Sequence, residues 1–130
     1  MLFDVAVRYS GGVAILKTPG SLTLSSGCEI RPAAVAVCES GHHLILIDCL
    51  DTVRVDSSGL GEMVAAYSAV IGRGGALKLL NVSDRLAKLL NLTGLDRLFE
   101  VHSDERTAIA SFRNAPNAKA RAALDGFLDT

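Results

Sequence analysis

The chain has 130 residues, of which 49% are hydrophobic but only 5% aromatic, and this predicts one domain with a core of Val, Leu, Ile and Ala. Thirteen Lys and Arg against fourteen Asp and Glu leave a formal net charge of −1. No basic stripe stands out, which argues against nucleic acid as a partner. Three cysteines, Cys28, Cys38 and Cys49, are spaced for neither a redox pair nor a zinc site, so we expect buried free thiols.

The first half of the chain predicts a hairpin, a helix and a buried strand. Residues 2–9 and 13–18 are short apolar segments separated by a Ser-Gly-Gly turn. Residues 28–39 are Ala-rich and predict a helix in which Pro32 is tolerated near the first turn. Residues 43–49 are almost uniformly apolar, which is typical of a strand buried on both faces of a mostly parallel sheet.

The second half predicts alternating helices and strands. Apolar residues recur at helical spacing after Ser57, and the following strand favours a right-handed crossover between parallel neighbours. We expect a helix from 57 to about 72, a strand over 76–81, a short helix over 83–94, a strand over 96–102 and a final helix over 103–112. The expected order is β-β-α-β-α-β-α-β-α, followed by a tail that adds a short helix or frays.

No targeting or membrane segment is apparent. The N-terminus lacks the pattern of a secretory signal, and no run approaches the roughly 18 apolar residues that a membrane helix needs. We therefore expect a cytoplasmic protein without a membrane-inserted segment.

Residues 54–63, RVDSSGLGEM, place two serines at a predicted helix start, but the pattern argues against catalysis. A nucleophilic serine at such a turn needs the motif G-x-S-x-G, and Val55 and Asp56 stand where the upstream glycine would be. None of the three histidines is placed beside Ser57 or Ser58 by the sequence. We expect no catalytic residue and no enzymatic activity.

Two further site patterns also fail, so we expect neither a metal nor a cofactor. Residues 11–18, GGVAILKT, lack the glycine that a phosphate-binding loop requires before Lys17. His42 and His43 are adjacent, and adjacent residues on a strand point to opposite faces, which disfavours a shared metal ion.

Helix capping explains part of the DSSGLG pattern. Asp56, Ser57 and Ser58 are residues that accept hydrogen bonds from a first helical turn, an interaction worth about 1 kcal/mol. Capping does not explain Gly59 and Gly61, which are poor helix formers, and we expect these small residues to leave the hydroxyls uncrowded. A phosphate there would meet free N–H groups and the positive end of the helix dipole. Such a switch would act on a partner by adding a charge of about −1.5 to −2.

Two stretches, DCLDTVRVDSSGLGEMVAAY and GRGGALKLLNVSDRLAKLLNLTGLDRLFEV, resemble the STAS domain of bacterial anti-sigma-factor antagonists. The resemblance covers residues 3–112 and is most specific over 44–101. Four blocks follow the family's order: a buried strand ending in Asp48, the DSSGLG turn, Gly-Gly before a strand that leads to Asn-Val-Ser, and a leucine-rich helix closed by Thr-Gly-Leu.

The resemblance implies a single α/β STAS-like domain over residues 1–112, with a C-terminal extension over 113–130. It also implies a mixed central sheet of about five strands with about four helices mainly on one face. Family members of this kind have no activity of their own. The oligomeric state stays open, a homodimer being one alternative.

The function implied by the resemblance is a phosphorylation switch. A partner that is both a serine kinase and an anti-sigma factor phosphorylates the serine after the aspartate, here Ser57. The unphosphorylated protein binds that partner and frees the sigma factor, and a separate serine phosphatase resets the cycle. Asp56 would orient the hydroxyl. The helix start contacted by the partner would comprise Ser58, Gly59, Leu60 and Gly61.

One departure from the family pattern concerns the loop that takes part in partner docking. Family members in this cycle carry an acidic stretch after the second strand, whereas this chain has PGSLTLSS and no acidic residue over 20–27. The partner, or its docking on this loop, therefore differs. The alternative is a non-enzymatic STAS adaptor or sensor subunit of another assembly, either stressosome-like or accessory to a lipid transporter.

Overall fold

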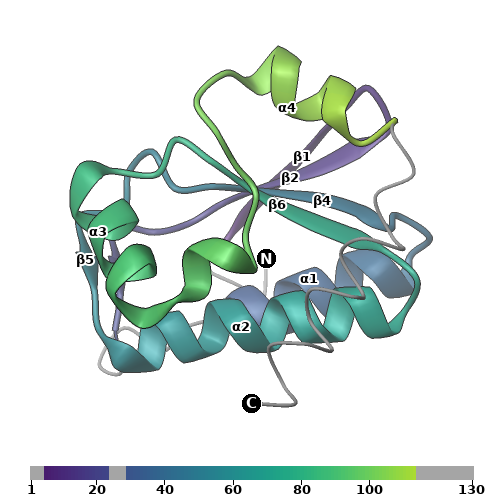
Figure 1. The fold of residues 1–130 in the computed structure, drawn as a ribbon. Coiled ribbons are helices and arrows are strands. Elements are labelled where there is room, and N and C mark those ends of the chain that lie inside the picture. Colours follow the sequence, from purple (N-terminus) through teal and green to yellow (C-terminus); the bar gives the residue numbers. More distant parts are fainter. Residues whose placement is uncertain (1–4, 24–28, 114–130) are drawn as a thin grey trace.

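The computed structural model describes residues 5–23 and 29–113, which form a mixed five-stranded sheet with helices on both faces (Figure 1). The strand order is β1-β2-β4-β6-β7, and only the β1–β2 pair is antiparallel. The strands are β1 Ala6–Ser10, β2 Val13–Lys17, β4 Leu44–Asp48, β6 Ala76–Leu80 and β7 Val101–His102. The expected fold class, an α/β domain with a mixed sheet, is confirmed.

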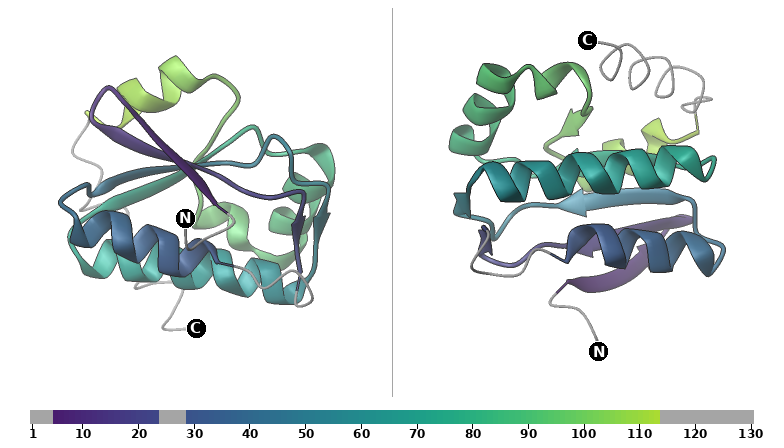
Figure 2. Two further views of the ribbon diagram at one scale, coloured as in Figure 1. Left: turned by 180° about the vertical axis from the view of Figure 1, so that it is seen from behind. Right: turned by 90° about the horizontal axis from the view of Figure 1, so that it is seen from below.

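Two helices cover one face of the sheet, a third lies beyond its edge on the same side, and one short helix covers the other face. Helices α1 (Ile30–Glu39) and α2 (Ser57–Gly72) lie side by side beneath the sheet, with α3 (Asp84–Thr93) beyond its edge on the same side (Figures 1 and 2). Helix α4 (Glu105–Ser111) lies on the opposite face. The expectation that the helices lie mainly on one face is confirmed.

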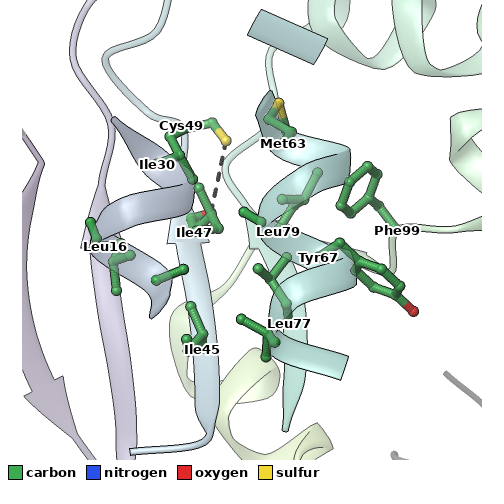
Figure 3. Close-up of a cluster of buried hydrophobic side chains, with 14 of the residues drawn as sticks. Leu16, Ile30, Ile45, Ile47, Cys49, Met63, Tyr67, Leu77, Leu79 and Phe99 are labelled. Carbon is green, nitrogen blue, oxygen red and sulfur yellow. Dashed lines mark hydrogen bonds between the residues drawn. The ribbon is translucent and has the colours of Figure 1, made fainter. Parts of the chain in front are cut away.

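The main core lies between the sheet and helices α1 and α2. Strand side chains on this face pack against helix side chains, and the rings of Tyr67 and Phe99 meet edge to face with centroids 5.3 Å apart (Figure 3). The labelled members of this cluster include Leu16, Ile30, Ile45, Ile47, Met63, Leu77 and Leu79. Strand β4 is buried on both of its faces, because Leu46 belongs to a second, smaller cluster beneath α4. Its uniformly apolar sequence predicted this position correctly.

Two short strands were not expected from the sequence. Strands β3 (Ser21–Leu22) and β5 (Arg54–Val55) pair in parallel and form a separate two-stranded sheet. Two residues are too few to show a period, so the alternation of side chains could not reveal them. Their pairing matters because β5 leads directly into helix α2.

The strand expected over 96–102 is wrong in its first part. Leu95–Arg97 is a 3-10 helix, and only Val101–His102 joins the sheet. Gly94 takes a left-handed conformation with φ 78°, and Leu95, Leu98 and Phe99 then turn into the core. Their i, i+3, i+4 spacing is that of a helical turn, and this local burial outweighed the β propensity of the segment.

The structure also tests the expectations that the cysteines are buried and that no segment crosses a membrane. Cys38 and Cys49 are buried free thiols, as expected, and burial raises the pKa of Cys49 to about 12. Cys28 and the tail from 114 to 130 lie outside the described residues. In the part of the chain that the structure describes, no helix has both the length and the apolar character needed to cross a membrane.

Candidate interaction site at the start of helix α2

Asp56 caps helix α2, and this leaves the two following serines at the surface. Asp56 has extended backbone, and its Oδ1 accepts a hydrogen bond from the Gly59 N–H at 3.0 Å. Its carbonyl oxygen accepts from the Leu60 N–H, also at 3.0 Å. The capping prediction is therefore confirmed, with the aspartate rather than a serine as the cap.

Ser57 and Ser58 occupy the first two positions of the helix, and both are exposed. Within the described residues, neither hydroxyl makes a hydrogen bond, and the first turn of α2 holds no acidic side chain. An exposed hydroxyl at a helix N-terminus is accessible to an enzyme. The positive end of the helix dipole also favours an anion attached there.

The structure gives a different reason for the glycine at position 59 from the one that the sequence suggested. It is buried, and a Cβ built on it would lie 1.9 Å from the carbonyl oxygen of Leu22. Glycine is needed here because the helix backbone approaches β3 closely, not because it keeps the serines uncrowded. Gly61 differs, since it is exposed and a Cβ there would meet nothing within 4 Å.

The six residues predicted at the site therefore divide into a surface group and a buried pair. Asp56, Ser57, Ser58 and Gly61 lie on the surface at the helix start, whereas Gly59 and Leu60 are buried beneath them. Leu60 is only 8% exposed and belongs to the main core. In this conformation only the first group is accessible from solvent.

The segment after β2 lies beside the two serines. The pairing of β3 with β5 brings it to the start of α2. The Asp56 N–H donates to the Leu22 carbonyl oxygen at 3.2 Å, and the Val53 N–H donates to that of Gly20 at 2.8 Å. The described part of this segment, residues 20–23, carries no acidic side chain. Residues 24–27, the rest of the loop expected to lack acidic residues, lie outside the described residues.

A hollow beside the helix start was missed by the sequence reasoning. It has a volume of about 10 Å³, roughly the space of one water molecule. Its lining residues are Thr52, Val53 and Val55 on one side and Ser83, Arg85, Leu86 and Leu89 on the other. Leucines over 86–90 predicted a buried helix face correctly. The spacing of Arg85 and Leu89, one helical turn apart, was the signal for a second face turned toward β5.

The histidines lie in other settings. The ring of His42 packs against that of Tyr9, tilted by 38° with centroids 4.4 Å apart, and His102 Nε2 lies 2.6 Å from the Glu100 carboxylate. Among the described residues no group of three or more His, Cys, Asp or Glu side chains is arranged to hold a metal ion.

Comparison with known proteins identifies the family. A model of the STAS domain matches residues 4–108. The anti-sigma-B factor antagonist of Bacillus subtilis (strain 168) is 32% identical over 102 residues, which cover 78% of this chain and 92% of the relative.

Solved structures share the fold. An anti-sigma factor antagonist from Mycobacterium paratuberculosis has a TM-score of 0.74 at 21% identity, covering 85% of this chain and 94% of that one. SpoIIAA in its unphosphorylated form has a TM-score of 0.69 at 20% identity, covering 85% and 96%. SpoIIAA of Bacillus in its phosphorylated form has a TM-score of 0.60 at 19% identity, covering 80% of this chain and 96% of that one. From its family match and its Bacillus relative, this chain belongs to the STAS domain family.

Proposed function

We propose that this protein is an anti-sigma-factor antagonist whose binding is switched by phosphorylation of Ser57. The observation that carries the proposal is that different residues cap the helix and present the free hydroxyl. Asp56 takes the capping bond, so the Ser57 hydroxyl is left exposed at the first position of the helix. A serine that capped the helix itself would have its oxygen engaged by a backbone N–H.

The surroundings of Ser57 tolerate a phosphate without unfolding the domain. The first turn of α2 lacks acidic side chains, and the helix dipole places partial positive charge there. Phosphorylation would set a dianionic group beside the Asp56 carboxylate on an exposed surface. The consequence falls on whatever docks there, through charge repulsion and the bulk of the phosphate.

Two relatives support this reading. The Bacillus subtilis protein, 32% identical, is named an anti-sigma-B factor antagonist. SpoIIAA, which shares the fold, is known in unphosphorylated and phosphorylated forms. In the proposed cycle, an anti-sigma factor that is also a serine kinase binds the unphosphorylated protein and phosphorylates it. A serine phosphatase restores it, and the protein itself has no enzymatic activity and acts in the cytoplasm.

The partner would contact the surface group around Ser57. Asp56 holds the helix start and orients the hydroxyl, while Ser58 and Gly61 form the adjoining surface. Gly59 and Leu60 support this surface from beneath, where both are buried.

The test is phosphorylation by each serine-kinase anti-sigma factor encoded in the source genome, followed by mapping of the phosphosite. We expect one phosphate on Ser57, none in Ser57→Ala, and unchanged transfer in the matched control Ser58→Ala. Ser57→Ala should retain partner binding, and Ser57→Asp should weaken it. Phosphate on Ser58 alone, or no phosphate with any kinase, contradicts the proposal.

A second candidate is a non-enzymatic adaptor or sensor subunit of another assembly. The observation that favours it is the absence of acidic side chains in residues 20–23, which adjoin the start of α2 and where the family resemblance led us to expect acidic groups. Equal affinity of Ser57→Ala and Ser57→Asp for the partner would support the adaptor, because an adaptor does not read the charge at residue 57.

A further inference from the structure

Edge strand β7 carries an exposed valine on the side of the sheet where α1 and α2 lie. Helix α1 contacts β2 and helix α2 contacts β6, but the helix that follows β7, α4, lies on the opposite face (Figure 1). Val101 of β7 pairs with Leu79 and therefore points to the same face as Leu79, which belongs to the main core. Val101 is nevertheless 45% exposed. The α2 side of the sheet is thus less covered at β7 than at the central strands.

The flank of α2 that faces away from α1 is uncharged. The Arg31 N–H of α1 donates to Glu62 Oε1 at 3.2 Å, so Glu62, the one charged residue of α2, lies on the α1 side. At 100° per residue, the half-buried Val64 and Ser68 lie about 160° and 120° around the helix from Glu62. A helix exposed to solvent normally carries charged residues on its outer side, so an uncharged flank suits contact with another element. We call Val64, Ser68 and Val101 the α2–β7 face.

The chain leaves α4 close to the C-terminal end of α2. Phe112 lies in the same buried cluster as Ala76, the first residue of β6. The residue before β6, Gly75, donates its N–H to the Val70 carbonyl oxygen of α2 at 2.9 Å. The ends of α4 and α2 therefore lie at the same end of the sheet, on opposite faces (Figure 1).

The sequence after α4 has the pattern of an amphipathic helix, and it lies beyond residues 4–108, which the family model matches. Apolar residues recur at i, i+3, i+4, i+7 and i+8, and they are Ala120, Ala123, Leu124, Phe127 and Leu128. The charged residues of the segment fall outside this apolar stripe, namely Lys119, Arg121, Asp125 and Asp129. A helix this short is marginal alone in water, so it needs to bury its apolar stripe against another element.

The connection after α4 is long enough to bring this segment to the α2–β7 face. Layers of secondary structure lie about 10 Å apart, so the path from the layer of α4 past the sheet to the layer of α2 is about 20 Å. Residues 113–118 reach about 20 Å when extended. Pro116, within this stretch, favours extended backbone in the residue before it. A helix over 119–128 is about 15 Å long, shorter than the 16-residue α2.

We propose that residues 119–128 form an additional helix that packs on the α2–β7 face of the same chain. Its leucine and phenylalanine side chains cover Val101 and lie against Val64 and Ser68. A segment of the same chain is favoured over a second copy, because a short tether gives it an effective concentration in the millimolar range. Docking of this helix extends the domain to residue 128 and does not depend on phosphorylation of Ser57, so either proposal can fail alone.

Amide exchange and amide resonances of the full chain test the docking. In the wild type, N–H groups over 123–128 should be protected, because each donates within the helix. Leu124→Ser/Phe127→Ser should abolish this protection and shift resonances over 64–72 and 100–102. The matched control Ala122→Ser/Gly126→Ser changes the polar side of the same helix and should do neither. Absence of protection in the wild type, or shifts only outside those two ranges, overturns the proposal.

Substitutions on the α2–β7 face provide the reciprocal test. Ser68→Glu and Val101→Glu should each lower Tm by about 5 °C and abolish protection over 123–128, because docking would bury the new charge. Ala87→Glu, on the exposed surface of α3, is the control and should change neither. Protection in β4 identifies the variants that remain folded. If both face variants keep the protection over 123–128, the segment docks elsewhere and the proposal is wrong.

A dilution series distinguishes the chain's own segment from that of a second copy. Protection over 123–128 should not change with protein concentration. Protection that appears only as a dimer forms would assign the α2–β7 face to a second copy and overturn the intramolecular docking.

Discussion

Helices α2 and α3 begin with the same two residue types in opposite order. In α2, Asp56 caps and Ser57 follows; in α3, Ser83 caps and Asp84 follows. The capping geometry is the same, because each cap oxygen accepts from the N–H three residues on, at 3.0 Å and 3.1 Å. The two helix starts therefore differ in which side chain makes the capping hydrogen bond: the aspartate in α2 and the serine in α3.

This order decides what the serine can do. The Ser83 oxygen is engaged by the backbone of α3, and the acidic Asp84 already faces the positive end of the helix. At α2 the aspartate is engaged, the Ser57 hydroxyl is exposed, and the first turn holds no acidic residue. The comparison teaches that a serine near a helix start is available for modification when another residue supplies the cap.

Reversing the order in α2 should abolish phosphorylation while leaving the helix capped. In Asp56→Ser/Ser57→Asp, a serine can still accept from the Gly59 N–H, so the free energy of unfolding should change by less than about 0.5 kcal/mol. The kinase that modifies the wild type should transfer no phosphate, as measured by phosphosite mapping. Ser57→Thr is the control and should remain a substrate; phosphate on the relocated serine would contradict the comparison.

The third residue of each helix sharpens the contrast further. Gly59 of α2 lies against the backbone of Leu22, whereas Leu86 of α3 reaches the core. Gly59→Ala should lower the free energy of unfolding by about 3 kcal/mol, because the added Cβ displaces β3. Gly61→Ala, with open space around it, should instead raise it by about 0.5–1 kcal/mol. Urea unfolding measures both, and similar effects would refute the close approach.

Removing the capping side chain of α2 or of α3 should lower the free energy of unfolding by a similar amount. Asp56→Ala and Ser83→Ala should each lower the free energy of unfolding by about 1 kcal/mol, since each leaves one N–H of the first turn unpaired. Ser57→Ala, measured in parallel by urea unfolding, should change it by less than about 0.5 kcal/mol because the hydroxyl makes no capping bond. A larger effect of Ser57→Ala than of Asp56→Ala would reverse the assignment of the cap.

The cap of α4 adds a small dependence on pH. Hydrogen bonds from the Thr107 hydroxyl and N–H hold the pKa of the exposed Asp104 below its usual value. A lowered pKa means that the carboxylate stabilises α4 fully above its ordinary pKa and loses this effect as pH falls through the lowered one. The protection of α4 amides from exchange, measured relative to their intrinsic exchange rates, should therefore fall as pH drops below the usual pKa of an aspartate. The non-titrating cap in Asp104→Ser should flatten this dependence, and the Ser83-capped α3 should lack it.

Most helices and the central strands could be predicted, because their signals lie within single segments. The apolar run over 43–49 identified β4, and the cap residues with periodic apolar positions identified α2 and α3. The 3-10 turn at 95–97 was missed because a short apolar segment fits a strand and a helical turn equally well. At the site, the sequence identified the capped helix start and the candidate hydroxyl of Ser57.

What the sequence by itself determined is the local chemistry: which residues begin α2 and α3, which strand is central, and which serine follows the capping aspartate. The tertiary structure alone decided that Gly59 packs beneath Leu22, that the segment after β2 adjoins Ser57, and that α3 and β5 line one small hollow. These features depend on backbone contacts between segments more than thirty residues apart, such as Val53 N–H to the Gly20 carbonyl oxygen. Side-chain patterns within one segment do not encode such a pairing, because it is set by where the sheet and the helices bring the two segments together.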